Sequence, residues 1–409
     1  MKLKSASLIV ALAVMLTACA KEQPGNDSTA VPADLVAGNT AFALDLYHRL
    51  AVQEGNLFFS PHSLSTALAM THAGARGETE RDLAALLHFT LPSDQVPGAF
   101  GALDRRLGEI SKQKQVRLSV ANSLWGQRDQ PFTDQFLAVT RQHFGAQIGL
   151  VDFVGAAERA RQKINTWVAR KTGDKIQNLL APGAVGPTTR LVLGNAIYFK
   201  GDWARPFDRS ATAPADFFVT PTRSVQAPLM YLKTKIRGQS FDGFSAFELP
   251  YQGETLSMIV LLPEARDGLA ALEATLTANH LHNWLAALDA ARPEEAMVYL
   301  PKFKLEWKSD LKPTLAALSR GVAFDARQAD FSGMTGNRDL FISAVIHQAV
   351  VEVNEQGTEA AAATGVVVAL TDLPPPPRVF RADHPFIFLI REKSSGSVLF
   401  LGRVVDPTR

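Results

Sequence analysis

Six runs of β-branched and aromatic residues, all after residue 190, constrain the fold most. Several are apolar nearly throughout, which is typical of central strands covered on both faces. Earlier stretches instead have the spacing of helices that bury one face, at residues 40–50, 64–70, 81–87, 99–110 and 157–170. This division predicts an α+β fold. The predicted strands are 191–199, 257–262, 297–300, 345–353, 386–390 and 398–405.

The overall composition excludes several classes of protein. The chain has 409 residues, 46% of them hydrophobic, which is enough for a large core. Its 42 basic and 40 acidic residues leave a net charge of +2, so we expect no nucleic-acid partner. Cys19 is the only cysteine, so the monomer forms no disulfide.

The N-terminus has the pattern of an export signal. Lys2 and Lys4 precede a short apolar stretch at residues 8–16, which ends at Leu-Thr-Ala-Cys19. This ending resembles the lipobox of bacterial lipoproteins, although a plain secretory signal with an incidental cysteine is the alternative. We predict a signal peptide (1–18), lipidation of Cys19, a polar tether (19–37) and one folded domain (38–409). The expected location is the outer membrane, on its periplasmic or cell-surface side, with the lipid as membrane anchor.

Motifs for catalysis or metal binding are absent from the sequence. It contains no Gly-x-Ser-x-Gly, no His-Glu-x-x-His and no phosphate-binding glycine loop. Ser60, Ser63 and His347 offer a nucleophile and a base, but Ser60 precedes Pro61 without the glycines of a nucleophile elbow. His347 lies among apolar strand residues and is more simply a hydrogen-bonded core histidine. We therefore predict that the chain is not an enzyme and needs no metal or cofactor.

The segment from Asn354 to Thr364 resembles the hinge of the serpin family of protease inhibitors. By itself its Glu-Ala-Ala-Ala-Ala sequence favours a helix. Six further blocks in family order argue otherwise. Residues 56–63 contain Phe-Ser-Pro-x-Ser, and residues 195–203 contain Asn-x-x-Tyr-Phe-Lys-Gly-x-Trp. Family-like blocks also occur at 300–303, 330–334, 383–388 and 400–404.

The resemblance implies a fold and a mechanism. Serpins have three β-sheets, eight or nine helices and an exposed reactive-centre loop. A target protease cleaves the loop and becomes covalently attached as an acyl-enzyme, and the loop then inserts into the main sheet as a new strand. The implied partner is a protease, and the chain is expected to be a monomer. A non-inhibitory serpin that acts as a surface binding module is the alternative.

The side-chain pattern of the hinge permits insertion. Alternate residues of a strand lie on opposite faces, so the face that begins at Thr358 and continues to Leu370 carries no charge. The opposite face carries one charge, at Glu359. A full set of strand hydrogen bonds, each worth about 1 kcal/mol, totals on the order of 10 kcal/mol. The predicted hinge residues are Glu355, Gly357, Thr358, Glu359, Ala360, Ala361, Ala362, Ala363 and Thr364.

Spacing typical of the family, counted from Glu355, places the scissile bond between Thr371 and Asp372. Cleavage after Leu370 or after Asp372 is the alternative. Residues 368–371 include no basic side chain, which favours elastase-like serine proteases, or cysteine proteases, over trypsin-like ones. Four prolines at 374–377 depart from the usual family pattern.

Five other residues match structural positions of the family. By resemblance Ser60, Ser63, Asn195 and His347 form the shutter, a polar cluster beneath the point where the sheet opens. Trp203 matches the breach, where the hinge first enters the sheet.

Overall fold

The computed structural model describes residues 31–112, 116–356 and 376–409. Cys19, the hinge residues from Gly357 to Thr364 and the predicted scissile bond lie outside these ranges. The described part nevertheless includes both strands that flank the predicted insertion point, and Glu355 at the end of one of them.

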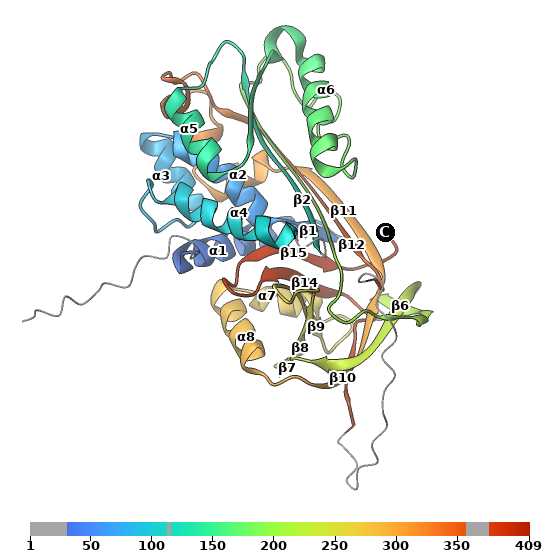
Figure 1. The fold of residues 1–409 in the computed structure, drawn as a ribbon. Helices are drawn as coiled ribbons and strands as arrows, with labels where there is room; N and C mark the ends of the chain where they lie inside the picture. Colours follow the sequence, from blue (N-terminus) through green and yellow to red (C-terminus); the bar gives the residue numbers. More distant parts are fainter. Residues whose placement is uncertain (1–30, 113–115, 357–375) are drawn as a thin grey trace, which may run out of the picture. The chain divides into compact units, whose positions relative to one another are not determined.

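Three β-sheets organise the described residues and confirm the predicted α+β class (Figure 1). The main sheet is five-stranded, in the order β11 (Phe303–Asp310), β12 (Ile342–Val353), β4 (Leu191–Gly201), β2 (Val116–Gln127) and β3 (Gln147–Val151). A six-stranded sheet has the order β1 (Leu57–Phe59), β15 (Val398–Val404), β14 (Phe386–Glu392), β9 (Leu256–Pro263), β8 (Phe244–Pro250) and β7 (Gly238–Phe241). The four-stranded sheet has the order β13 (Arg378–Arg381), β10 (Glu294–Pro301), β6 (Arg223–Ile236) and β5 (Asp208–Thr220).

Ten α-helices occur in the described ranges, rather than the eight or nine expected from the resemblance. The shortest, α10, has only four residues. Helix α1 begins at Ala33, inside the range predicted as a tether, because Leu35 is buried against the core. The helices are α1 (Ala33–Leu50), α2 (Pro61–Gly74), α3 (Gly77–Leu86), α4 (Val96–Lys112), α5 (Asp134–His143), α6 (Phe153–Thr172), α7 (Leu269–Thr275), α8 (Ala278–Ala290), α9 (Lys312–Leu318) and α10 (Ser332–Thr335), with a 3-10 turn η1 (Val322–Phe324).

All six predicted strands are present, but other long strands were missed. Strands β5 and β6 expose much of one face, so they contain few of the continuous apolar runs on which the prediction relied. Tertiary pairing with neighbouring strands, rather than local composition, makes these segments extended.

Apolar layers cover both faces of the main sheet. On one face, Trp125 of β2 and Tyr198 of β4 belong to a cluster with Ile164 and Val168 of α6. On the other face, the ring of Phe199 lies 5.2 Å from that of Phe400 on β15. Burial on both faces explains why β4 and β12 are apolar almost throughout.

The centre of the main sheet is a parallel pair. Strand β12 runs parallel to β4, with His347 opposite Asn195 and Val351 opposite Phe199. Each of these strands is antiparallel to its outer neighbour, β11 or β2. A strand that returned from the end of β12 and entered between the pair would therefore be antiparallel to both.

Candidate functional site

The start of α2 positions two of the predicted shutter serines. Ser60 is the N-cap of the helix, and its Oγ accepts a hydrogen bond of 3.1 Å from the N–H of Ser63. Pro61 occupies the first helical turn, where its missing N–H costs nothing. The Ser60 hydroxyl donates to the carbonyl of Leu399 on β15, at 2.7 Å. The Ser-Pro-x-Ser sequence thus fixes the helix against the six-stranded sheet.

His347 joins this helix to the centre of the main sheet. The N–H of Ser60 donates to Nε2 of His347 at 3.2 Å, so the ring proton lies on Nδ1. Nδ1 in turn donates to Oδ1 of Asn195, which lies opposite on β4. Complete burial lowers the pKa of His347 to about 3, so the ring is neutral at physiological pH. A side-chain hydrogen bond therefore links the two strands of the parallel pair.

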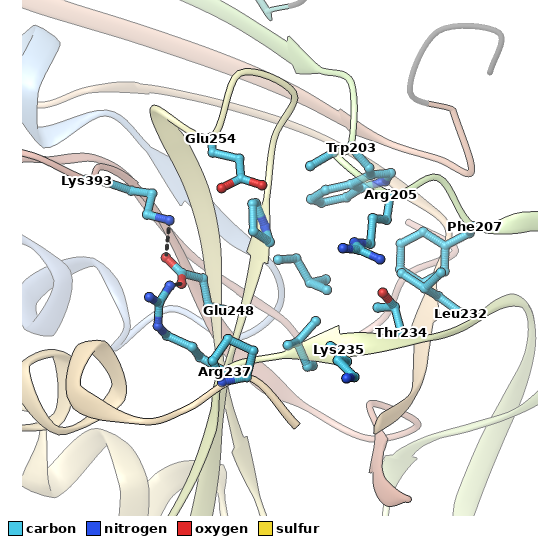
Figure 2. Close-up of a pocket in the computed structure, with 15 residues that line it drawn as sticks. Trp203, Arg205, Phe207, Leu232, Thr234, Lys235, Arg237, Glu248, Glu254 and Lys393 are labelled. Carbon is cyan, nitrogen blue, oxygen red and sulfur yellow. Dashed lines mark hydrogen bonds and ion pairs between the residues drawn. The ribbon is translucent and has the colours of Figure 1, made fainter. Parts of the chain in front are cut away.

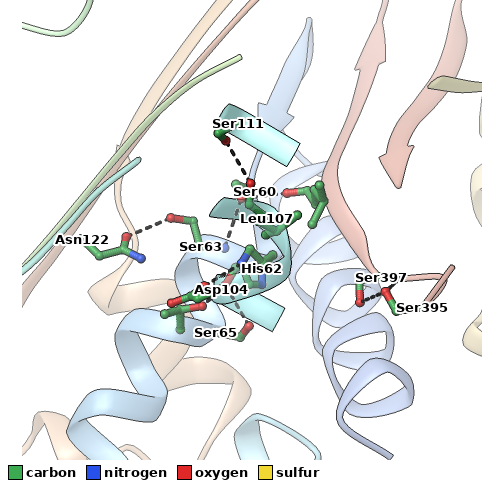
Figure 3. Close-up of polar contacts among 12 residues, drawn as sticks. Ser60, His62, Ser63, Ser65, Asp104, Leu107, Ser111, Asn122, Ser395 and Ser397 are labelled. Carbon is green, nitrogen blue, oxygen red and sulfur yellow. Dashed lines mark hydrogen bonds and ion pairs between the residues drawn. The ribbon is translucent and has the colours of Figure 1, made fainter. Parts of the chain in front are cut away.

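Asn122 completes the cluster and is not among the residues predicted from the sequence. The Asn195 amide donates to the carbonyl and Oγ of Ser63, at 2.9 and 2.7 Å. The Ser63 hydroxyl donates to Oδ1 of Asn122 on β2, at 2.9 Å (Figure 3). An asparagine in the middle of a long strand was the available signal, but β2 itself was not predicted. We call Ser60, Ser63, Asn122, Asn195 and His347 the shutter cluster.

The neutral state of His347 makes stability depend on pH. The folded-state pKa lies below the value of about 6.5 in an unfolded chain, so the unfolded state binds more protons between these values. The contribution of His347 to stability is full above pH 6.5 and is lost as the pH falls toward 3. Between pH 7.5 and 5 the loss is about 2 kcal/mol.

A His347→Gln variant should lack this part of the pH dependence. In urea unfolding at pH 7.5 and 5.0, the stability difference between wild type and variant should narrow by about 2 kcal/mol at the lower pH. His282→Gln, at an exposed position of α8, is the control and should behave like wild type. If the free energies of unfolding of wild type and His347→Gln differ by the same amount at both pH values, His347 is not buried in the neutral form.

Trp203 lies where the chain leaves β12. Its Nε1–H donates to the carbonyl of Asn354 at 2.9 Å, and its ring stacks on Tyr251 at a centroid distance of 4.6 Å. The backbone N–H of Phe207 donates to the carbonyl of Glu355 at 3.2 Å. Trp203 and Phe207 also line one side of a pocket beside β6 and β8 (Figure 2). The last described residues before the predicted loop are thus held at the position that the sequence analysis assigned to the breach.

Glu355 adds an ion pair at the same point. Its carboxylate lies 3.1 Å from the ammonium of Lys302, and its side chain is largely buried. Burial opposes ionisation, but the backbone N–H of Glu355 and the Lys302 ammonium outweigh it and lower the pKa of the carboxyl. The carboxylate is therefore charged and ties the end of β12 to the segment that precedes β11.

Reversing the charge of Glu355 should loosen the breach. Glu355→Lys places two ammonium groups together, and we expect the free energy of unfolding to fall by about 1–2 kcal/mol because Lys302 is half exposed. The double variant Lys302→Glu/Glu355→Lys should recover most of this loss, whereas Glu264→Lys, at an exposed position, should change little. Equal stability of Glu355→Lys and wild type in urea titrations would contradict a contribution from the pair.

The geometry does not support hydrolysis at this cluster. His347 accepts a hydrogen bond from the backbone N–H of Ser60, whereas the Ser60 hydroxyl donates to the Leu399 carbonyl. The hydroxyl that would be the nucleophile is therefore not paired with the histidine that would be the base. In the described ranges, no group of three or more His, Cys, Asp or Glu side chains could hold a metal ion. What the cluster does instead is connect β2, β4, β12 and α2.

Comparisons with known proteins agree with this arrangement. The family model described as "Serpin (serine protease inhibitor)" matches residues 37–407. The leukocyte elastase inhibitors of Bos taurus and Homo sapiens are each 42% identical, over 91% of this chain and 99% of each relative. Uncleaved ovalbumin superimposes with a TM-score of 0.83 at 31% identity, over 91% of this chain and all of that one. Maspin gives 0.84 at 29%, over 92% and 99%. The chain belongs to the serpin family.

The same comparisons support the prediction that the chain is not an enzyme. The family is described by inhibition of serine proteases, and the relatives of Bos taurus and Homo sapiens are named as inhibitors. The predicted serpin fold is also confirmed, because the superpositions cover 91% and 92% of the chain.

The predicted location and the assignment to bacterial lipoproteins are corrected by the relatives. We expected a lipid-anchored protein of an outer membrane, but the matched relatives are leukocyte elastase inhibitors of Bos taurus, Homo sapiens and Sus scrofa. These organisms have no bacterial outer membrane, and the names of these three relatives do not describe a lipoprotein. The prediction was wrong because it rested on a few residues around Cys19, whereas the comparison extends over 91% of the chain. Among the described helices, none combines the length and apolarity needed to cross a membrane.

Proposed function

We propose that the chain is an irreversible inhibitor of serine endopeptidases that acts by loop cleavage and strand insertion. The observation that carries this proposal is the parallel pair β12–β4 at the centre of the main sheet. Strand β12 runs directly into the hinge at Asn354 and Glu355, next to the end of β4. A strand inserted there would replace one parallel ladder by two antiparallel ladders, which are slightly more stable per residue.

The length of the loop suits this path. Strand β12 has 12 residues and therefore spans about 40 Å. Residues 357–371 number 15, so after a short turn they can cover the length of β12 in extended form. A protease bound at Thr371 would then be carried from one end of the main sheet to the other.

The shutter cluster and the breach would control this insertion. The bond between His347 and Asn195 links the strands that must separate, and Trp203 and Lys302 hold the residues that must move first. Ser60 and Ser63 of α2 form hydrogen bonds with the same two side chains, His347 and Asn195. These serines therefore offer fixed hydrogen-bond partners when the sheet closes again. Together these contacts favour the uninserted state until cleavage releases the loop.

The target that we propose is an elastase-like serine protease. The matched relatives are named leukocyte elastase inhibitors, and residues 368–371 contain no basic side chain that a trypsin-like protease would require. Thr371–Asp372 stays our predicted scissile bond, with Leu370 as the alternative donor of the acyl group, and cysteine proteases stay an alternative class. We further propose that the folded domain, predicted as residues 38–409 and begun by α1 at Ala33, is inhibitory and acts as a monomer.

Incubation with a protease panel tests the proposal. Elastase-like, trypsin-like, chymotrypsin-like and papain-like enzymes are each mixed with the full chain and analysed on denaturing gels and by mass spectrometry. We expect a covalent complex with an elastase-like enzyme and a released peptide that begins at Asp372. Cleavage in the loop by every enzyme without a covalent complex would contradict inhibition and favour the alternative, a non-inhibitory binding module.

A further inference from the structure

The four-stranded sheet presents an ordered row of large side chains on its outer face. Residues that alternate with them, such as Met230, Val298 and Phe380, are buried in the core. The outer residues are in register across three strands: Tyr231 lies opposite Tyr299, and Tyr299 opposite Arg381. The next rung contains Lys233, Met297 and Val379. We call Tyr231, Lys233, Met297, Tyr299, Val379 and Arg381 the ladder face.

Side chains of the ladder face stack on one another. The rings of Tyr231 and Tyr299 lie 5.1 Å apart, and the guanidinium carbon of Arg381 lies 4.9 Å from the centroid of Tyr299. Asp383 holds Arg381 in place at 2.8 Å. Val379 in the adjacent rung is 52% exposed. Tyrosine, methionine and arginine are enriched at protein–protein interfaces, and Tyr and Arg dominate their binding energy.

The ladder face carries charges of both signs, but Lys233 has no acidic residue opposite it in the sheet. Lys233 is exposed on β6 and lies opposite Met297, whereas Lys235 lies opposite Glu295, and Tyr231 lies opposite Asp208 on β5. Arg378 lies at the edge of the sheet, with its guanidinium over Phe380. The exposed ammonium group of Lys233, beside the aromatic and apolar side chains, attracts acidic groups of a partner surface and raises the rate of encounter.

The position of the ladder face along the chain indicates its occupant. Arg378, at the start of β13, follows Asp372, on the far side of the predicted scissile bond, by only six positions. Six residues span at most about 21 Å. A protease of about 230 residues has a radius of gyration of roughly 17 Å, so its body extends well beyond its active site. Any protease that binds the loop at Thr371 is thereby placed next to this sheet.

We propose that the ladder face is a second docking surface for the target protease, separate from the reactive-centre loop. The matching partner surface is apolar with acidic groups at its rim and lies beside the protease's active site. Contact there holds the protease over the loop and accelerates formation of the initial complex. The inference rests on the proposed function, because it takes its partner from the cleavage of the loop.

Binding of an inactivated protease tests the docking surface without insertion. The probe is an elastase-like serine protease whose active-site serine is replaced by alanine, and its affinity for the full chain is measured by surface plasmon resonance. Tyr231→Ala, Lys233→Glu and Val379→Ala should each weaken binding, with about a tenfold loss for Lys233→Glu that shrinks at high salt. The matched controls are Val154→Ala and Lys171→Glu, at exposed positions of α6, and they should leave the affinity unchanged.

Kinetics with active protease provide the second measurement. The ladder-face variants should lower the second-order rate constant of covalent complex formation by the same factor, while the stoichiometry of inhibition and the melting temperature stay at wild-type values. Equal affinity of all variants for the inactivated protease, or no binding to wild type, would overturn the docking surface. A change in stoichiometry or melting temperature would also overturn it, because the ladder-face residues would then act on loop insertion or on the stability of the fold. Failure of the proposed function is a different result: the inactivated protease binds, but active protease forms no covalent complex.

Discussion

Thr358→Arg is expected to convert the chain from an inhibitor into a substrate. Thr358 begins the uncharged face of the predicted inserting strand. An inserted strand would lie between β12 and β4, in a sheet that apolar layers cover on both faces. An unpaired charge buried there costs several kcal/mol, so insertion slows and hydrolysis of the acyl-enzyme overtakes it. Each 1.36 kcal/mol on the insertion barrier shifts this competition about tenfold.

The stoichiometry of inhibition measures this competition directly. We expect the number of chains consumed per inactivated protease molecule to rise by about tenfold or more, with cleaved chain replacing covalent complex on denaturing gels. Glu359→Arg is the matched control, because it changes the face that already carries a charge, and its effect should be smaller. Equal inhibition by Thr358→Arg and wild type would refute insertion of this segment.

Cleavage of the loop should raise thermal stability sharply. Insertion replaces the parallel β12–β4 ladder by two antiparallel ladders and adds a strand to the centre of the main sheet. The gain is on the order of 10 kcal/mol, which for a domain of this size corresponds to a rise in melting temperature of roughly 13 °C. Calorimetry of the chain before and after limited proteolysis by a non-target protease measures the rise. Thr358→Arg, cleaved in the same way, should show a smaller increase, and an unchanged melting temperature of the cleaved wild type would favour the non-inhibitory alternative.

Much of the local structure could be predicted from the sequence. The apolar runs at 191–199 and 345–353 became the central strands β4 and β12, because residues buried on both faces must be apolar. A serine followed by a proline favours the start of a helix, because the serine side chain caps the first turn and the proline needs no N–H there. Ser60 and Pro61 begin α2 in this way. These predictions succeed because a few neighbouring residues determine them.

Predictions that depended on distant residues were incomplete. Asn122 belongs to the shutter cluster because β2 lies beside β4, a contact between residues 73 positions apart in the sequence. Strands β5 and β6 expose one face and are extended chiefly through pairing. The predicted cellular location was wrong for a different reason. It rested on a motif of a few residues around Cys19, which says little about the rest of the chain.

The sequence by itself determined the family, the hinge pattern and the apolar strands of the main sheet, because each is written in consecutive residues or in blocks of fixed order. The tertiary structure alone decided that β12 and β4 are parallel neighbours, that His347 carries its proton on Nδ1, and that Tyr231, Tyr299 and Arg381 form one surface. Each of these depends on the register between strands that are distant in the chain. Such a register follows from the packing of the whole fold, and no local pattern specifies it.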